Sequence, residues 1–297
     1  MLAETQKPHT LSLFINDVLL LTKARLTLSV VFSSIAGYLL AVASANMWHI
    51  LLLSIGGYGL AGASNALNQI IEKEIDAKMI RTQNRPIPAG RMSTQAAFSI
   101  AITLLILGLV ILYALNPKTA MFGAISVFLY TCAYTPLKTV TPLSVFVGAI
   151  PGAIPFMLGW VSATGNFGIE SGILFMIQFF WQFPHFWAIG WMMHSDYQKA
   201  GINMLPTGST GNATALQIIL YTLWTIVISI IPVFGFTEAL QLSVVAAVVV
   251  GAVGLMLLWT GFQLYRNHSV ANAKKLMIMS IAYITAIQWI YVLDKFI

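Results

Sequence analysis

Long apolar stretches joined by short polar connections dominate the pattern along the chain. As helices, stretches of about 20 predominantly apolar residues are long enough to cross a bilayer core of about 30 Å. Strand-like alternation with turn signals about every ten residues is lacking, which favours helices over a membrane barrel. The nine predicted spans are 24–44, 48–70, 94–115, 118–136, 140–161, 170–193, 213–233, 239–262 and 274–294.

The composition agrees with a membrane protein. Of the 297 residues, 58% are hydrophobic and 8% are charged, whereas soluble domains carry about 25% charged residues. Because the connections are short, no soluble domain fits between the spans. We therefore expect an all-α, polytopic fold in which residues 1–297 form a single membrane-embedded domain.

Basic residues predict the orientation of the bundle. A cytoplasmic N-terminus places thirteen Lys and Arg residues inside and leaves only Lys118 and Lys295 outside, in agreement with the positive-inside rule. Nine crossings then place the C-terminus outside. This topology explains the net charge of +6 without nucleic acid as a partner. The lipid bilayer of a prokaryotic cytoplasmic membrane is the expected location.

The first 22 residues have neither the pattern of a signal peptide nor that of a mitochondrial transit peptide. Within this short cytoplasmic segment, Thr10–Thr22 is either a helix at the membrane interface or a simple polar lead into the first span. The single cysteine, Cys132, falls inside an apolar span. It excludes a disulfide or a cysteine metal cluster within the chain.

Acidic residues are scarce, and three of the nine fall within Glu72–Asp76 at the end of the second span. Asn68, Glu72 and Asp76 are four residues apart, so a helix presents them as one stripe. Asn65 lies at the upper end of that stripe. One amide oxygen and two carboxylates are the hard ligands that Mg²⁺ prefers.

Basic residues follow this stripe, at Lys78, Arg81, Arg85 and Arg91. Carboxylates next to arginines suggest a polyphosphate site, because a metal bridges carboxylates to phosphate oxygens while arginine donates to the remaining oxygens. The alternative is a solvated charged loop at the end of a span. The regular four-residue spacing of the oxygen ligands leaves the two interpretations about equal.

Two further polar clusters are predicted on the same side of the membrane. The first runs from His194 through Asp196, Tyr197 and Lys199 to Gly201 after span six, at a position that matches the stripe after span two. This correspondence suggests two related halves that face one cavity. The second cluster, Tyr130–Lys138, brings Lys138 within reach of a phosphate, although Lys138 is also an ordinary positive-inside residue.

Span six is the most polar of the nine. Gln178, Gln182 and His185 share one helical face, and Pro184 is expected to kink the helix. If the helix continues undistorted, Asp196 lies near that face and His194 points away from it. Intramembrane His and Gln generally face a cavity or a partner. His185 is either a substrate contact or a satisfied structural residue, and the same choice applies to the neighbouring aromatics Trp181, Phe183, Phe186 and Trp187.

Together these motifs resemble the UbiA-type intramembrane prenyltransferases. That family has an Asn-x-x-x-Asp-x-x-x-Asp run after span two and a second Asp-containing run after span six. The likeness extends from about Lys23 to the C-terminus, and two motifs are most similar to the members that use heme as acceptor. The matching segments are Asn68–Asp76, Arg81-Thr-Gln-Asn-Arg85-Pro86, Tyr134–Lys138, Trp181–Phe186 and Asp196-Tyr-Gln-Lys-Ala-Gly201.

The resemblance implies farnesyl diphosphate and heme B as substrates and Mg²⁺ as cofactor. It assigns catalysis and metal binding to Asn68, Glu72, Asp76 and Asp196, and a heme contact to His185. It also leaves room for a heme A synthase or a terminal oxidase assembly protein as partner. The diphosphate-binding residues that it implies are Arg81, Arg85, Tyr134, Lys138, Tyr197 and Lys199.

Three positions depart from the family pattern. Glu72 replaces an aspartate, Ala200 stands where relatives that prenylate quinone precursors have a second acid, and Thr139 follows Lys138 where a basic residue is common. These departures put a symmetric second Mg²⁺ and one phosphate contact in doubt. The competing functions are prenylation of a quinone precursor or chlorophyllide, transport of an anionic lipid, and a structural or heme-carrying role.

Overall fold

The computed structural model describes residues 11–297, and its regular elements in that range are helices. The first half comprises α1 (Leu11–Leu21), α2 (Ala24–Ala41), α3 (Met47–Ile71), α4 (Lys73–Asp76), α5 (Thr94–Leu115), α6 (Pro117–Phe128), the π-helical η1 (Leu129–Tyr134), α7 (Thr135–Leu137) and α8 (Ser144–Thr164). The second half comprises α9 (Ile169–Met192), α10 (His194–Lys199), α11 (Asn212–Ile230), the 3₁₀-helical η2 (Ile231–Phe234), α12 (Val244–Arg266) and α13 (Val270–Phe296).

Eight helical segments in the described range are long and apolar enough to cross a membrane, which makes the chain a multi-pass membrane protein. They correspond to eight of the nine predicted spans. The predicted sixth span, α9, is a continuous helix of 24 residues, but it is not among the eight. Its glutamine, histidine and tryptophan side chains lower its hydropathy below that of the others.

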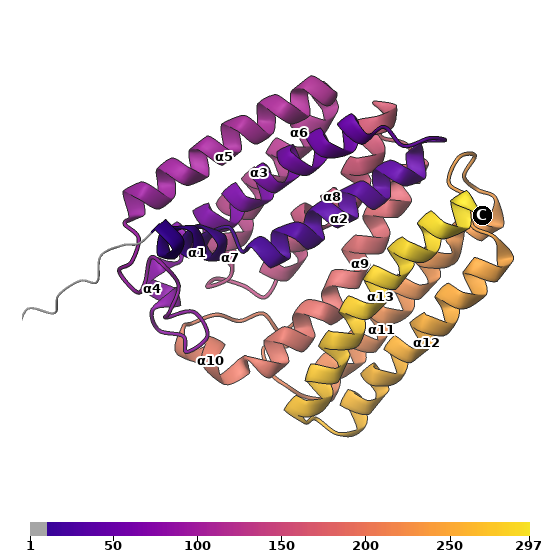
Figure 1. Ribbon diagram of the computed structural model, residues 1–297. Coiled ribbons are helices and arrows are strands. Elements are labelled where there is room, and N and C mark those ends of the chain that lie inside the picture. The colour runs from indigo at the N-terminus through magenta and orange to yellow at the C-terminus, as the bar shows by residue number, and fades with distance from the viewer. Residues whose placement is uncertain (1–10) are drawn as a thin grey trace, which may run out of the picture.

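The long helices form two neighbouring groups (Figure 1). In the first group α2 packs on α3 and α8, and α3 packs on α5; in the second, α11 and α13 pack on α9 and α12. Contacts of α8 with α9, and of α2 with α13, join the two groups. The short helices α4 and α10, which continue α3 and α9, lie at the same end of the bundle (Figure 1).

Small residues allow the two central helices of the first group to approach closely. A Cβ atom at Gly159 of α8 would collide with the backbone carbonyl oxygen of Ser34 in α2, and one at Gly37 of α2 would collide with that of Phe156. Membrane helices commonly pack through such small residues, because van der Waals contact rather than water exclusion drives their association. This crossing fixes α2, and with it the segment that precedes α2, against α8.

Three predicted span starts are wrong by four or five residues, and one of them, 274, is too late because α13 begins at Val270. The predicted span 140–161 begins at Ser144, because residues 139–143 form turns, and the predicted span 239–262 begins at Val244. Ser243 caps that helix by accepting a hydrogen bond from the Ala246 amide at 3.1 Å. The apolar residues before Ser243 are buried loop, including Leu240 and Leu242, which explains why hydropathy placed the start too early.

Candidate functional site

The predicted Asn68–Glu72–Asp76 stripe is present, although the helix that carries it is interrupted. Helix α3 ends at Ile71, Glu72 has φ −90° and ψ 9°, and α4 follows. The Glu72 amide still donates to the Asn68 carbonyl at 2.9 Å and the Asp76 amide to the Glu72 carbonyl at 2.7 Å, so the four-residue repeat continues through the break. The three residues are 1%, 5% and 0% exposed. They are therefore not part of a solvated charged loop.

Each carboxylate of the stripe is paired with a cation. Lys138 Nζ lies 2.7 Å from Glu72 Oε1, and Arg85 lies 2.5 Å from Asp76 Oδ2. The Tyr134 ring lies beneath the Lys138 ammonium at 4.4 Å from its centroid and positions it by a cation–π contact. Burial raises the pKa of Asp76, while the charge of Arg85 opposes that rise. The site thus holds Arg85 and Lys138 where the sequence predicts diphosphate-binding residues.

Asn68 is oriented by Thr135, the first residue of α7, which is held in turn by the π-helical segment η1. Its Nδ2 donates to Thr135 Oγ1 at 3.0 Å, and Thr135 Oγ1 donates to the Tyr130 carbonyl at 2.8 Å. Single turns of π-helix often occur at functional sites. Because its amide nitrogen is held by Thr135, Asn68 turns its Oδ1 toward Lys23, whose Nζ lies 3.5 Å away.

Lys23 is a site residue that sequence reasoning missed. It separates α1 from α2 in a left-handed conformation with φ 47° and ψ 54°. Burial, with a smaller effect of the positive charges on Arg85 and Lys138, lowers the pKa of Lys23 to about 7. In the sequence it counts only as one more positive-inside residue before the first span. The backbone turn that aims it at Asn68 has no signature there.

Hydrogen bonds from α3 hold this turn in place. Gln69 Nε2 donates to the carbonyls of Leu20 at 3.0 Å and Leu21 at 2.8 Å. Asn65 Nδ2 donates to Thr27 Oγ1 at 3.3 Å. Asn65, predicted at the upper end of the stripe, therefore anchors the start of α2. Helix α3, which carries Asn68 and leads into the two carboxylates, therefore also positions Lys23.

The second predicted motif contacts the loop that follows the first. Asp196 Oδ1 accepts a hydrogen bond from the Ile80 amide at 3.3 Å. Arg81 donates to the Tyr197 hydroxyl at 3.3 Å and lies over its ring at 5.7 Å. Lys199 is exposed, and its ammonium has no hydrogen-bond or ion-pair partner within residues 11–297. Residues from the two halves of the chain therefore meet at one end of the bundle.

The structure does not group the predicted metal ligands into one shell. Among residues 11–297, no three His, Cys, Asp or Glu side chains lie together closely enough to hold a metal ion. Asp196 binds backbone instead of joining the two carboxylates of the stripe. Oxygen ligands are nonetheless available: Asp76 Oδ1 is buried and has no hydrogen-bond partner in this part of the chain. Together with the Asn68 amide oxygen it provides the hard donor set that suits Mg²⁺.

One arginine considered for the phosphate site lies outside it. Arg91 forms an ion pair with Asp17 of α1, with Arg91 Nη2 2.9 Å from Asp17 Oδ1. This contact ties the 77–92 loop to α1. Asp17 is 4% exposed, so it is a buried, arginine-paired carboxylate like Asp76 but away from the Asn68 stripe.

The polar residues of α9 bind different neighbours despite their predicted common face. Gln178 Oε1 accepts from the Phe156 amide at 3.3 Å, and Gln182 Nε2 donates to the Ala149 carbonyl at 2.9 Å, both on α8. His185 instead contacts Ser280 of α13 through Nδ1 at 2.8 Å. Pro184 lies inside α9. The glutamines join the two halves, whereas His185 lies within the second half.

The aromatic residues of α9 fall into two groups. Phe183 and Trp187 are buried and pack against Tyr221 of α11, with tilted and edge-on rings and centroid separations of 4.5 and 4.9 Å. They belong to the packing of the second half. Trp181 and Phe186 are half-buried beside His185.

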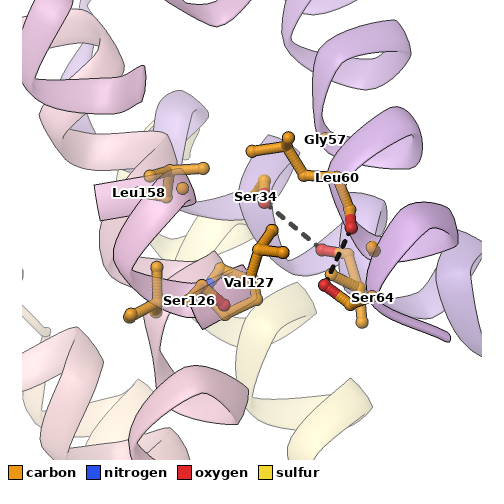
Figure 2. A pocket seen from close by; sticks show the side chains of 12 residues that line it. Ser34, Gly57, Leu60, Ser64, Ser126, Val127 and Leu158 are labelled. Atoms are coloured by element: carbon orange, nitrogen blue, oxygen red, sulfur yellow. Dashed lines mark hydrogen bonds between the residues drawn. The ribbon is translucent and has the colours of Figure 1, made fainter. Parts of the chain in front are cut away.

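A cavity lies among α2, α3, α6 and α8 (Figure 2), and the α3 residues that line it, from Gly57 to Ser64, precede Asn68 along the helix. Its volume is about 50 Å³, and its lining includes Ser34, Leu60, Ser64, Val127 and Leu158. Ser64 Oγ donates to the Leu60 carbonyl at 2.9 Å, so its hydroxyl is satisfied within α3. Because about 10–15 Å³ of such volume is needed to hold one water, the cavity has room for a few waters or a small apolar group.

The UbiA prenyltransferase family matches residues 30–284. The chain is 61% identical over 293 residues to a protoheme IX farnesyltransferase of Flavobacterium psychrophilum, covering 98% of this chain and 97% of the relative. Both similarities extend over nearly the whole sequence.

Solved structures share the fold at low sequence identity. A digeranylgeranylglyceryl phosphate synthase superposes with a TM-score of 0.77 at 17% identity, covering 95% of this chain and 98% of the other. A UbiA homologue from Archaeoglobus fulgidus, bound to GPP and Mg²⁺, superposes with a TM-score of 0.69 at 15% identity, covering 93% and 99%. The bundle of Figure 1 is therefore a UbiA-type fold.

Proposed function

The chain belongs to the UbiA prenyltransferase family and, within it, to the protoheme IX farnesyltransferases, and we propose on this premise how its site works. It is a prenyltransferase that makes heme O, with farnesyl diphosphate and heme B as its substrates. The observation that carries the mechanism is the buried stripe Asn68–Glu72–Asp76 with its paired cations.

Asn68, Glu72 and Asp76 are the residues that would hold Mg²⁺ with the diphosphate. Mg²⁺ held there would supply positive charge that neutralises the leaving diphosphate. Arg85 and Lys138, which pair with the carboxylates in this structure, exchange those partners for phosphate oxygens when the substrate binds. Lys23, whose pKa is lowered to about 7 by burial beside Arg85 and Lys138, adds a third cation from the α1–α2 turn when the negative charge of a bound diphosphate favours its protonated form. Fixed positive charge stabilises the transition state because it is already oriented when the C–O bond breaks.

Residues of the second half close the diphosphate site from the other side. Arg81 and Lys199 supply charge, Asp196 holds the loop at Ile80, and Tyr197 orients Arg81. Asp196 would be available to Mg²⁺ only after the 77–85 loop releases its carboxylate from the Ile80 amide. Tyr134 acts by supporting Lys138.

The reaction has two bond-forming steps at the heme vinyl group. The farnesyl C1–O bond breaks and diphosphate leaves with the electron pair, while the vinyl carbon forms a bond to C1. Water then adds to the cation beside the porphyrin ring and releases one proton, which gives the hydroxyl of heme O. Apolar surroundings keep water from the allylic cation until the carbon–carbon bond has formed. We assign the heme contact to His185 and name no general base.

The orientation in the membrane is also a proposal. The basic residues place the stripe, the 77–92 loop and α10 on the cytoplasmic side of a prokaryotic cytoplasmic membrane, with α9 as a ninth crossing and the C-terminus outside. Helix α1 exposes Leu11, Phe14 and Leu20 while burying Asp17. This distribution suits a helix at the membrane interface. Lys7 and Thr10, part of the sequence prediction for this region, lie outside the described residues.

Analysis of the reaction products tests the function. Purified protein in detergent is incubated with farnesyl diphosphate, Mg²⁺ and one acceptor, either heme B, a quinone precursor or chlorophyllide, and the products are identified by mass spectrometry. A hydroxyethylfarnesyl heme formed only with heme B is expected, and it should disappear with EDTA. A prenylated quinone precursor or chlorophyllide, without any heme product, would contradict the assigned acceptor.

A further inference from the structure

An apolar groove lies on the outside of the first group of helices, between α2, α3 and α5. Its lining includes Leu28 and Val31 of α2, Tyr58 and Gly59 of α3, and Leu107 and Gly108 of α5. Its volume is about 320 Å³, within the range of about 300–1,000 Å³ that is typical of ligand sites. Leu28 and Leu107 are exposed, so the groove opens on the lipid-facing surface of the bundle.

The floor of the groove is the close crossing of α3 and α5. A Cβ atom at Gly59 would lie 2.9 Å from the Leu104 carbonyl oxygen, and one at Gly108 would lie 2.9 Å from the Gly56 carbonyl oxygen. Because backbone forms this floor, no rotation of a side chain at these two glycines can fill the groove. The hollow is therefore a fixed feature of the helix packing.

The walls of the groove suit a hydrocarbon chain. Its only two polar side chains are already hydrogen-bonded: Ser54 Oγ donates to the Ile50 carbonyl at 2.7 Å, and the Tyr58 hydroxyl lies 3.1 Å from Thr22 Oγ1. The other lining residues are Leu, Ile, Val and Gly. A polar ligand would lose its water here without gaining hydrogen bonds, whereas an acyl chain loses nothing on leaving the bilayer for such walls.

A cation lies in line with one end of the groove. Arg25 precedes Leu28 by three residues, so the two side chains share a face of α2. Arg25 is exposed, and its guanidinium has no hydrogen-bond or ion-pair partner among residues 11–297. Arginine donates charge-assisted hydrogen bonds to phosphate oxygens, and basic side chains at a membrane surface attract anionic lipids.

We propose that this groove binds one anionic phospholipid of the membrane, with an acyl chain against Tyr58 and Leu107 and the phosphate at Arg25. The site is distinct from the diphosphate site, because Gly59 and Asn68 are nine residues apart and so face opposite sides of α3. The bound lipid supports the α1–α2 turn through the contact of Tyr58 with Thr22. The inference goes beyond the proposed function and does not depend on the acceptor.

Native mass spectrometry of delipidated protein tests the headgroup contact. The protein is titrated with phosphatidylglycerol or with phosphatidylcholine of the same acyl chains, and the wild type is expected to retain one phosphatidylglycerol and to bind it more tightly than phosphatidylcholine. Arg25→Gln should bind phosphatidylglycerol about fivefold more weakly, the effect of one basic residue at a membrane surface. Arg266→Gln is the matched control, because Arg266 is an exposed cation at the end of α12, and it should bind as the wild type does.

A second pair of variants tests the groove itself. Leu107→Trp should abolish retention of both lipids, because the indole fills the groove. Ile106→Trp should bind as the wild type does, since Ile106 and Leu107 are each 55% exposed but only Leu107 lines the groove. Thermal unfolding in lipid-free detergent verifies that each variant is folded.

Three results would overturn the proposal. Equal affinity of the wild type for the two lipids, or wild-type affinity in Arg25→Gln, would remove the headgroup contact. Lipid binding by Leu107→Trp at the level of Ile106→Trp would place the lipid elsewhere on the protein. Displacement of phosphatidylglycerol by farnesyl diphosphate in the presence of EDTA would show that the groove belongs to the substrate.

Discussion

At the scale of single residues, the site depends on charges that the fold holds out of water. Asp76 is fully buried and Glu72 nearly so, and a buried carboxylate is costly unless it is paired and hydrogen-bonded. Arg85 and Lys138 provide those pairs. A diphosphate with its metal would present both signs of charge to the same residues, so the cations can exchange partners without leaving any charge uncompensated.

Lys23 gives a prediction at this scale. Lys23→Met should weaken farnesyl diphosphate binding about tenfold, since it removes one partly buried charge from the phosphate site. Heme binding should be unchanged. Arg25→Met is the matched control, because Arg25 lies two residues further on and is exposed. Calorimetric titration of each variant measures the effect, and equal affinities for Lys23→Met and the wild type would remove Lys23 from the site.

The sequence predicts the stripe, because acids are scarce and the spacing of Asn68, Glu72 and Asp76 is local. It also predicts Arg85 and Lys138 as neighbours of a phosphate. It does not predict Lys23 or Thr135, whose contacts with Asn68 join residues 45 and 67 positions apart in the chain. Charge patterning alone does not distinguish Arg85 from Arg91, because only the fold places Asp17 beside Arg91; the family resemblance names Arg85 and leaves Arg91 out.

At the scale of helices, hydropathy predicts which helices are present better than it predicts the residues at which they begin and end. The span 94–115 coincides with α5, whose start is capped by Ser93. Span 239–262 starts too early because an apolar loop precedes α12. The break at Glu72 between α3 and α4 was also not predicted. A similar break recurs at Met193 between α9 and α10, with φ −98° and ψ 11°, which favours the interpretation of two related halves.

The α2–α8 crossing predicts a difference between two glycine variants. Gly159→Ala should destabilise the protein by about 1–3 kcal/mol, since the added methyl group forces the helices apart. Gly251→Ala in α12 meets no atom within 4 Å and should be neutral or slightly stabilising, because alanine has the higher helix propensity. Thermal unfolding in detergent compares them. An unfolding temperature for Gly159→Ala equal to that of the wild type would show that the crossing tolerates a side chain.

At the scale of the whole molecule, the two groups of helices are joined where polar side chains meet. Ser33 of α2 accepts from Gln178 of α9 at 3.4 Å and from Gln288 of α13 at 2.9 Å. These contacts cross between the halves inside the bundle, where apolar side chains surround them. Polar side chains such as Gln178 lower the hydropathy of α9 below that of the eight apolar spans, and the same side chains bind the neighbouring helices.

Cysteine labelling tests the orientation of the bundle. In a Cys132→Ala background, Ala89→Cys should react with an impermeant reagent only from the cytoplasmic side and Phe236→Cys only from the outside. Both positions are exposed and lie in loops. The reason is the asymmetry of Lys and Arg between the two sides. Labelling of both cysteines from one side would show that the number of crossings between them is even, contrary to the nine-span arrangement.

The central claim is that the Asn68–Glu72–Asp76 stripe holds the diphosphate with Mg²⁺. Its most direct test is calorimetric binding of farnesyl diphosphate, without heme, to the wild type, Asp76→Asn and Asp17→Asn, each with Mg²⁺ or EDTA. Asp17 is the control because it too is buried and paired with an arginine. We expect the wild type and Asp17→Asn to bind tightly only with Mg²⁺, and Asp76→Asn to bind about 30-fold more weakly, or weaker still, in either condition. Wild-type, Mg²⁺-dependent binding by Asp76→Asn would contradict the account.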